Sequence, residues 1–276
     1  MRSPVLRPYL AIISARFQLV LQYRAAALAG FATQCWWGGM KVLIFSAFYA
    51  GAAAVAPMSF AHTVSYTWLG QAFLMFLPWY ADPEVTDMVR TGAVAYERLR
   101  PVDAWGWWYA RALAWTAARI VPRAALMFAT AAVLMPLVGL GRWGLRLPPD
   151  GSDAALFCAA IVAAALLSAT MTVLLNVVVA ASLTDRGANA FAAPITIVLS
   201  GSLVPLAFFP RPLVPLLRLQ PFAGLMDTPF RVWNGELAGT GAVGAIALQL
   251  AWTLVLALLG RRAVEAVMGR IQVQGG

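Results

Sequence analysis

Residues 154–182 read AALFCAAIVAAALLSATMTVLLNVVVAAS, and no side chain in this stretch is charged. A helix on the surface of a soluble protein keeps one polar face, whereas this stretch is apolar around most of its circumference. About 20 apolar residues are needed for a helix to cross the hydrocarbon core of a bilayer. The stretch therefore predicts a membrane-spanning helix and decides the fold class.

The composition of the whole chain agrees with that interpretation. Of its 276 residues, 62% are hydrophobic and only 11% are charged, whereas a soluble domain carries about 25% charged residues. The apolar residues lie in long runs, which a soluble core does not require. We therefore predict an all-α integral membrane protein that forms a single transmembrane domain over residues 1–276.

Further apolar runs bring the number of predicted spans to six. Besides the span within 154–182, they cover about 25–50, 64–80, 124–140, 190–209 and 241–259. Six spans place both termini on the same side of the membrane.

Two regions are predicted to lie against the membrane without crossing it. Residues 6–23 place Leu10, Ile13 and Phe17 on one face of a helix, which is typical of an amphipathic helix at the membrane surface. Residues 210–238 are apolar but contain five prolines, so a continuous helix is excluded there. Because free backbone groups cannot face lipid, we expect re-entrant helices sheltered by protein.

The most polar segment, 81–104, must lie outside the bilayer. Its charged residues are Asp82, Glu84, Asp87, Arg90, Glu97, Arg98, Arg100 and Asp103. Residues 104–123 follow with Arg111, Arg119 and Arg123 among tryptophans, a pattern that suits the cytoplasmic headgroup level.

Basic residues set the orientation. With the termini inside, the cytoplasmic segments hold fourteen arginines and the outer loops five. The outer five are Arg142, Arg146, Arg211, Arg218 and Arg231. An excess of basic residues marks cytoplasmic loops, so both termini are predicted to be cytoplasmic. Because the charge of +9 gathers beside the apolar segments, we expect membrane lipids rather than nucleic acid as the partner.

Three local patterns add a more specific indication. They are MVRTGAVAYERLRPV at 88–102, LSGSLVPLAFFPRPLVPLLRLQPFAGLMDTPFRVWNGE at 199–236, and the terminal VQGG at 273–276. Together they resemble the type-2 family of ATP-binding-cassette (ABC) exporter permeases, in its six-span branch ending in Gln-Gly-Gly. Members of that branch carry an arginine, a glycine and a Leu-Arg-Pro-like element after span two, and this chain reads Leu99-Arg100-Pro101 there.

The resemblance implies a permease dimer, with an identical or paralogous second subunit, bound to two copies of a separate ABC ATPase in a bacterial-type inner membrane. Segment 81–104 would be the cytoplasmic coupling loop and 210–238 the extracellular re-entrant region. The residues expected to couple to the ATPase are Asp82, Glu84, Arg90, Gly92, Glu97, Arg98, Arg100, Pro101, Asp185 and Arg186. A solvated charged loop with no docking role is the alternative interpretation of the same charges.

The chain has no ATPase motif of its own. A phosphate-binding loop needs the pattern Gly-x-x-x-x-Gly-Lys-Ser/Thr, but the only lysine, Lys41, follows Met40 in an apolar run. We therefore expect no catalytic residue and no cofactor in this chain, with ATP and magnesium bound by the partner. The expected substrate is hydrophobic or amphipathic and leaves the cytoplasm or the inner leaflet by alternating access.

A few polar residues within the spans are candidates for a substrate path. Lys41 would cost about 2.5–3.5 kcal/mol at a helix centre, which makes a functional role the default hypothesis, although it could also snorkel. The resemblance places spans one, two and five nearest the path, which adds Ser200 and Ser202. No metal site is expected, because His62 is the only histidine.

Two other functional classes are the alternatives. An intramembrane enzyme acting on lipids would need acids or histidines converging within the bundle, yet the acids of this chain lie in loops. An ion-coupled carrier would favour buried carboxylates or an inverted repeat of spans, and neither is evident.

Overall fold

The structure is a computed structural model that describes residues 7–22, 24–52, 56–99 and 102–270. Within these ranges the chain forms helices and turns, with no strand. The predicted all-α class is therefore confirmed for the part of the chain that the structure describes.

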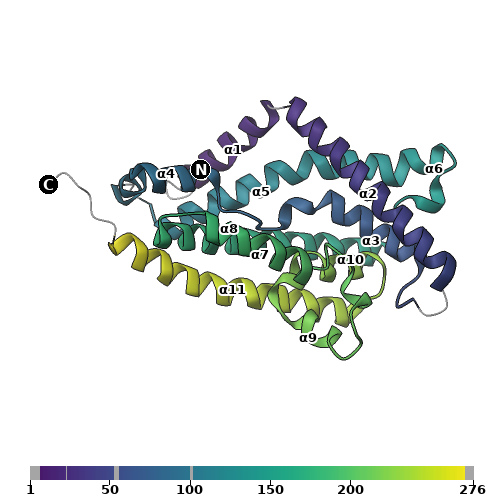
Figure 1. The fold of residues 1–276 in the computed structure, drawn as a ribbon. Coiled ribbons are helices and arrows are strands. Elements are labelled where there is room, and N and C mark those ends of the chain that lie inside the picture. The colour runs from purple at the N-terminus through teal and green to yellow at the C-terminus, as the bar shows by residue number, and fades with distance from the viewer. Residues whose placement is uncertain (1–6, 23, 53–55, 100–101, 271–276) are drawn as a thin grey trace.

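The helices follow one another in the order shown in Figure 1. They are α1 (Arg7–Gln22), α2 (Arg24–Ala52), α3 (Phe60–Ala72), α4 (Pro83–Thr91), α5 (Ala104–Phe128), α6 (Met135–Leu137), α7 (Gly151–Ser182), α8 (Arg186–Leu199), α9 (Val214–Leu219), α10 (Asp227–Trp233) and α11 (Gly239–Arg270). The helix predicted for 6–23 is present as α1.

Among the residues that the structure describes, three helices are long and apolar enough to cross a membrane. They are α7 and α11, each of 32 residues, and the 34-residue helix Ala104–Leu137, which joins α5 to α6 through a π-helical turn at Ala129–Leu134. Each contains an 18-residue stretch whose mean hydropathy lies between 1.8 and 2.3. Length and composition thus support the membrane character that the sequence predicts.

The helices at the other three predicted spans are either less apolar or shorter. Helix α2 has 29 residues but carries Gln34 and Lys41, and α3 and α8 have only 13 and 14 residues. At 1.5 Å per residue a helix of that length covers about 20 Å, against about 30 Å for the hydrocarbon core. Spans two and five would need the irregular segments that follow these helices, so the six-span layout stays a prediction.

The segment 104–123 belongs to the same helix as the predicted third span. It is the first part of a helix that starts at Ala104 and runs on without a break through Pro122. Its start is fixed by Asp103, whose carboxylate accepts a hydrogen bond from the Gly106 amide at 2.7 Å. Arg111 does not need the headgroup level, because its side chain is buried and pairs with carboxylates of the chain itself.

The helices form an elongated bundle with two apolar cores. In Figure 1, α4 lies at one end with the start of α5 and the end of α11, and α6, α9 and α10 lie toward the other end. The core at the α4 end includes Val85, Trp108, Val173 and Val264. The larger core lies between α3, α5, α7 and α10 and is rich in aromatic side chains, among them Phe73 and Phe230.

Helices α2 and α3 approach each other closely at Gly38. A Cβ atom added there would lie 2.6 Å from the ring of Trp68, whereas the neighbouring Gly39 has no atom within 4 Å of such a Cβ. The Trp68 ring cannot move aside easily, because it is 3% exposed and its Nε1 donates to the Trp143 carbonyl at 2.7 Å. Gly38 therefore serves packing within the chain, as small residues do between membrane helices.

The two glycines give a matched test of this packing. Gly38→Ala should lower the free energy of unfolding by about 1–3 kcal/mol, because an overpacked core must shift. Gly39→Ala should be neutral or stabilising by up to about 1 kcal/mol, since alanine is the better helix former. Thermal unfolding of both purified variants in one detergent checks the difference, and equal midpoints would contradict the close α2–α3 contact.

Candidate functional site

The predicted coupling loop contains the helix α4. Asp82 caps its N-terminus by accepting a hydrogen bond from the Glu84 amide at 3.0 Å, and Pro83 occupies the first turn, where no amide donor is needed. Gly92 ends the helix with a φ of 75°, a left-handed conformation that glycine adopts without strain. Residues 83–91 of the most polar segment therefore form a capped helix rather than an irregular loop.

One face of α4 is docked on the bundle and the other faces outward. Val85 and Val89, one turn apart, are 1% and 7% exposed and pack into the core formed with α5, α7 and α11. Asp87 and Arg90 lie on the exposed face. This division leaves a charged surface that another protein can reach, on a helix whose opposite side is anchored.

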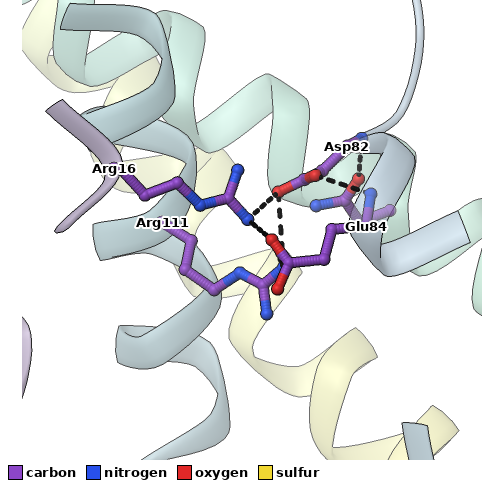
Figure 2. A network of polar contacts seen from close by, with 5 residues as sticks. Arg16, Asp82, Glu84 and Arg111 are labelled. Atoms are coloured by element: carbon purple, nitrogen blue, oxygen red, sulfur yellow. Dashed lines mark hydrogen bonds and ion pairs between the residues drawn. The ribbon is translucent and has the colours of Figure 1, made fainter. Parts of the chain in front are cut away.

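Four charged side chains anchor the start of α4, as Figure 2 shows. Arg16 of α1 pairs with Asp82 at 3.3 Å and also contacts Glu84. Arg111 of α5 lies 3.0 Å from Glu84 and 3.7 Å from Asp82. We call these four residues the α4 anchor; Asp82 and Arg111 are 1% and 2% exposed, so each charge depends on its partners.

The backbone amides of the cap residue and of the residue before it donate to amide side chains. The Asp82 amide donates to Asn176 Oδ1 of α7 at 2.8 Å, and the Ala81 amide donates to Asn189 Oδ1 of α8 at 3.0 Å. Asn189 in turn donates to Asp185 at 3.1 Å. Helices α1, α5, α7 and α8 therefore all contact residues 81–84.

A cleft joins the two regions in which coupling residues were predicted. Its volume is about 320 Å³, and Asp87 and Arg90 of α4 line it together with Asp185 and Asn189 at the start of α8. Segments a hundred residues apart in the sequence thus form one open, polar surface at the α4 end of the bundle.

The other predicted coupling residues lie at different depths. Glu97 is buried, while Arg186 is exposed beside this cleft. The backbone at Arg98 belongs to a 3₁₀ turn, Ala93–Leu99. The side chain of Arg98 and the residues Arg100 and Pro101 lie outside the described part of the structure.

Two of the three predicted path residues meet directly. Lys41 Nζ of α2 donates to the Ser202 carbonyl at 2.6 Å, just beyond the end of α8. Ser200 is buried, and its hydroxyl accepts a hydrogen bond from the Ser202 amide at 3.2 Å. The structure therefore places Lys41 at the junction of α2 with the segment that follows α8.

A buried carboxylate at the other end of the bundle was not predicted. Asp227, at the start of α10, is 1% exposed, and Arg218 and Arg231 lie 3.6 and 3.8 Å from its Oδ2 atom. Tyr66 of α3 donates a hydrogen bond to Oδ1 at 3.3 Å. Burial raises the pKa of Asp227 to about 6, against the opposing effect of the two arginines.

The sequence identified Asp82 and Glu84 as candidate residues, but it did not identify the arginines that pair with them. Arg16 was counted only among the fourteen cytoplasmic arginines, and Arg111 was placed at the headgroup level. Both are single charges in segments far from 81–84, so no local spacing pairs them. The helix α4 itself could have been found, because Asp82-Pro83 and Gly92 are start and stop signals.

Comparisons with known proteins give no match: no family model, no curated protein and no solved structure is similar to this chain. The resemblance to exporter permeases therefore depends on the three sequence patterns quoted above.

Removing the central carboxylate tests the α4 anchor. Asp82→Ala leaves the buried Arg16 and Arg111 with only the exposed Glu84 as a carboxylate partner. It also removes the helix cap, so we expect the free energy of unfolding to fall by about 3–5 kcal/mol. Hydrogen exchange at the amides of 83–91 should accelerate in the same variant. Asp87→Ala removes an exposed carboxylate of the same helix and should change stability by less than about 0.5 kcal/mol. Equal stability and equal hydrogen exchange in the two variants would contradict the anchoring role of Asp82.

Asp227 predicts a pH dependence of stability with a defined sign. Its folded pKa of about 6 lies above the ordinary value of 3.8, so the stability it contributes is present below pH 4 and is lost as the pH rises through 6. The groups facing it are Tyr66, Arg218, Arg231 and Glu236. Between pH 4 and 8 this loss amounts to about 3 kcal/mol of the free energy of unfolding. Asp227→Asn keeps the side chain neutral at every pH, so unfolding curves measured over that range should show a flatter pH dependence. An unchanged slope would rule out Asp227 as its source.

Proposed function

We propose that this chain is the transmembrane permease subunit of an ATP-driven exporter of the ABC class, powered by a separate ATPase. One observation carries the proposal. A charged helix, α4, lies at the end of an apolar bundle with Asp87 and Arg90 exposed, while its other side is fixed to the bundle by a buried core and the α4 anchor.

This arrangement suits the transfer of work between two proteins. A partner that grips the exposed face of α4 would displace the helices joined to it together, because the contacts of residues 81–84 reach α1, α5, α7 and α8. Shifting a two-state domain almost fully between its states takes about 5.5 kcal/mol of differential binding. Nucleotide-driven closure of two ATPase subunits is a source of that size.

The proposal includes a membrane topology and the partners of the chain. The chain would cross a bacterial-type inner membrane six times, with α4 and both termini in the cytoplasm and α1 in the membrane surface. Helices α9 and α10 would be the re-entrant pair on the outer side. A second permease, identical or similar, would complete the path, and the substrate would be hydrophobic or amphipathic.

Isolation of the assembly from native membranes tests this function. The tagged chain should co-purify with a polypeptide that carries Gly-x-x-x-x-Gly-Lys-Ser/Thr, and the complex in nanodiscs should hydrolyse ATP in a vanadate-sensitive manner. The chain freed of that partner should show no hydrolysis.

Charge-swapped variants locate the contact. The double variant Asp87→Lys/Arg90→Glu should co-purify with about tenfold less of the ATPase subunit, because like charges would meet across the interface. Arg211→Glu reverses an exposed charge near α9 and is the matched control. Full transport by the chain in vesicles that contain no ATPase would overturn the proposal, and undiminished ATPase binding by the double variant would remove α4 as the contact.

A further inference from the structure

A pocket with several polar residues in its lining lies between the helices α2, α3 and α8. Its volume is about 320 Å³, and its lining includes Gln34, Trp37, Lys41, Trp79, Ser202 and Leu203. Most of these residues come from apolar segments, so the polar groups among them are unusual for their surroundings.

Two buried polar atoms of the lining lack hydrogen-bond partners. Gln34 is 4% exposed, and within the described residues no group donates to its Oε1 atom. Trp79 Nε1 is likewise buried and finds no acceptor there. Buried polar atoms without partners are rare in native proteins because each one loses the hydrogen bonds that water would supply. A lining with one free acceptor and one free donor is what a bound polar ligand would satisfy.

Lys41 adds a positive charge to the same pocket. Its Nζ donates to the Ser202 carbonyl, but among the described residues no carboxylate lies within ion-pair distance of it. A cation in an apolar helix is costly unless it is paired or reaches water. An anionic group entering the pocket would supply the missing partner.

The rest of the lining includes apolar and aromatic side chains. Trp37, Leu74, Ile197 and Leu203 offer surfaces for hydrocarbon. The volume lies at the lower end of the range for ligand pockets, about 300–1,000 Å³. The pocket is therefore sized for a polar headgroup and the first part of an apolar chain rather than for a whole lipid.

We propose that this pocket binds an anionic amphiphile: its charged group contacts Lys41, a hydroxyl or amide N–H donates to Gln34 Oε1, and its apolar chain lies against Trp37 and Leu203. The inference deepens the proposed function and rests on it for the statement that such a molecule is exported. The ligand could come from a membrane lipid or from an exported solute, and the test separates the two.

Binding is measured without any ATPase, on the purified chain in phosphatidylcholine nanodiscs. The probe is a bromine-labelled N-acylglycine, which has a carboxylate, an amide N–H and an apolar chain, and its neutral methyl ester is the matched ligand. Bromine quenches nearby tryptophans, and Trp37 and Trp79 line the pocket. The acid should bind about tenfold more tightly than the ester, because only the acid pairs with Lys41.

Variants assign each contact. Lys41→Met should abolish the preference for the acid, whereas Lys41→Arg should keep it. Gln34→Leu should weaken acid and ester by a similar factor, since both carry the amide N–H. Arg211→Met removes an exposed cation elsewhere and should change nothing. Equal binding of acid and ester to the unaltered chain, or an undiminished preference in a folded Lys41→Met variant, would overturn the inference.

Adding phosphatidylglycerol to the nanodiscs identifies the source of the ligand. Competition with the probe would assign the pocket to an anionic membrane lipid, and undiminished probe binding would assign it to a single-chain amphiphile. Because no ATPase is present, failure of binding overturns only this inference, whereas the exporter proposal stands or falls on the co-purified partner.

Discussion

A single buried carboxylate, that of Asp82, holds one end of this protein together. Its side chain is 1% exposed, so its charge is tolerable only with partners in place. Arg16 from α1 and Arg111 from α5 supply them, and the backbone of Asp82 is fixed by Asn176 of α7. Because the same carboxylate caps α4, the position of α4 cannot change without disturbing contacts with three other helices.

The opposite end of the bundle also contains a buried acid that pairs with arginines, but at longer distances. Asp227 is also an almost fully buried acid between two arginines, but its ion pairs are 3.6 and 3.8 Å long and its Oδ2 atom has no hydrogen bond within the described residues. The bundle is thus pinned by a buried acid at each end, and the helices between are held by apolar and small side chains such as Gly38.

An interaction could be predicted from the sequence only where the residues that make it lie close together along the chain. Hydropathy is local, so the all-α class and the long apolar helices α7 and α11 were found from runs of residues. The pairing of Arg111 with carboxylates was missed, because an arginine in an apolar segment suggests a surface unless its partners are known. Those partners, Asp82 and Glu84, lie at the start of α4 and are brought near by tertiary packing alone, which no spacing in the sequence encodes. The pairing of Lys41 with the Ser202 carbonyl is of the same kind, since 161 positions separate them.

The proposed contact for an ATPase and the proposed ligand pocket are joined by two short connections. Trp79 lines the pocket, and only three residues later Asp82 caps α4. Helix α8 forms the second connection, because Asn189 near its start accepts from the Ala81 amide while Ile197 near its end lines the pocket. A displacement of α4 would therefore reach two walls of the pocket at once, through the chain and through α8. If the exporter proposal holds, this geometry lets work done on α4 change the affinity of the pocket, and by linkage a ligand in the pocket would bias the position of α4 by the same free energy.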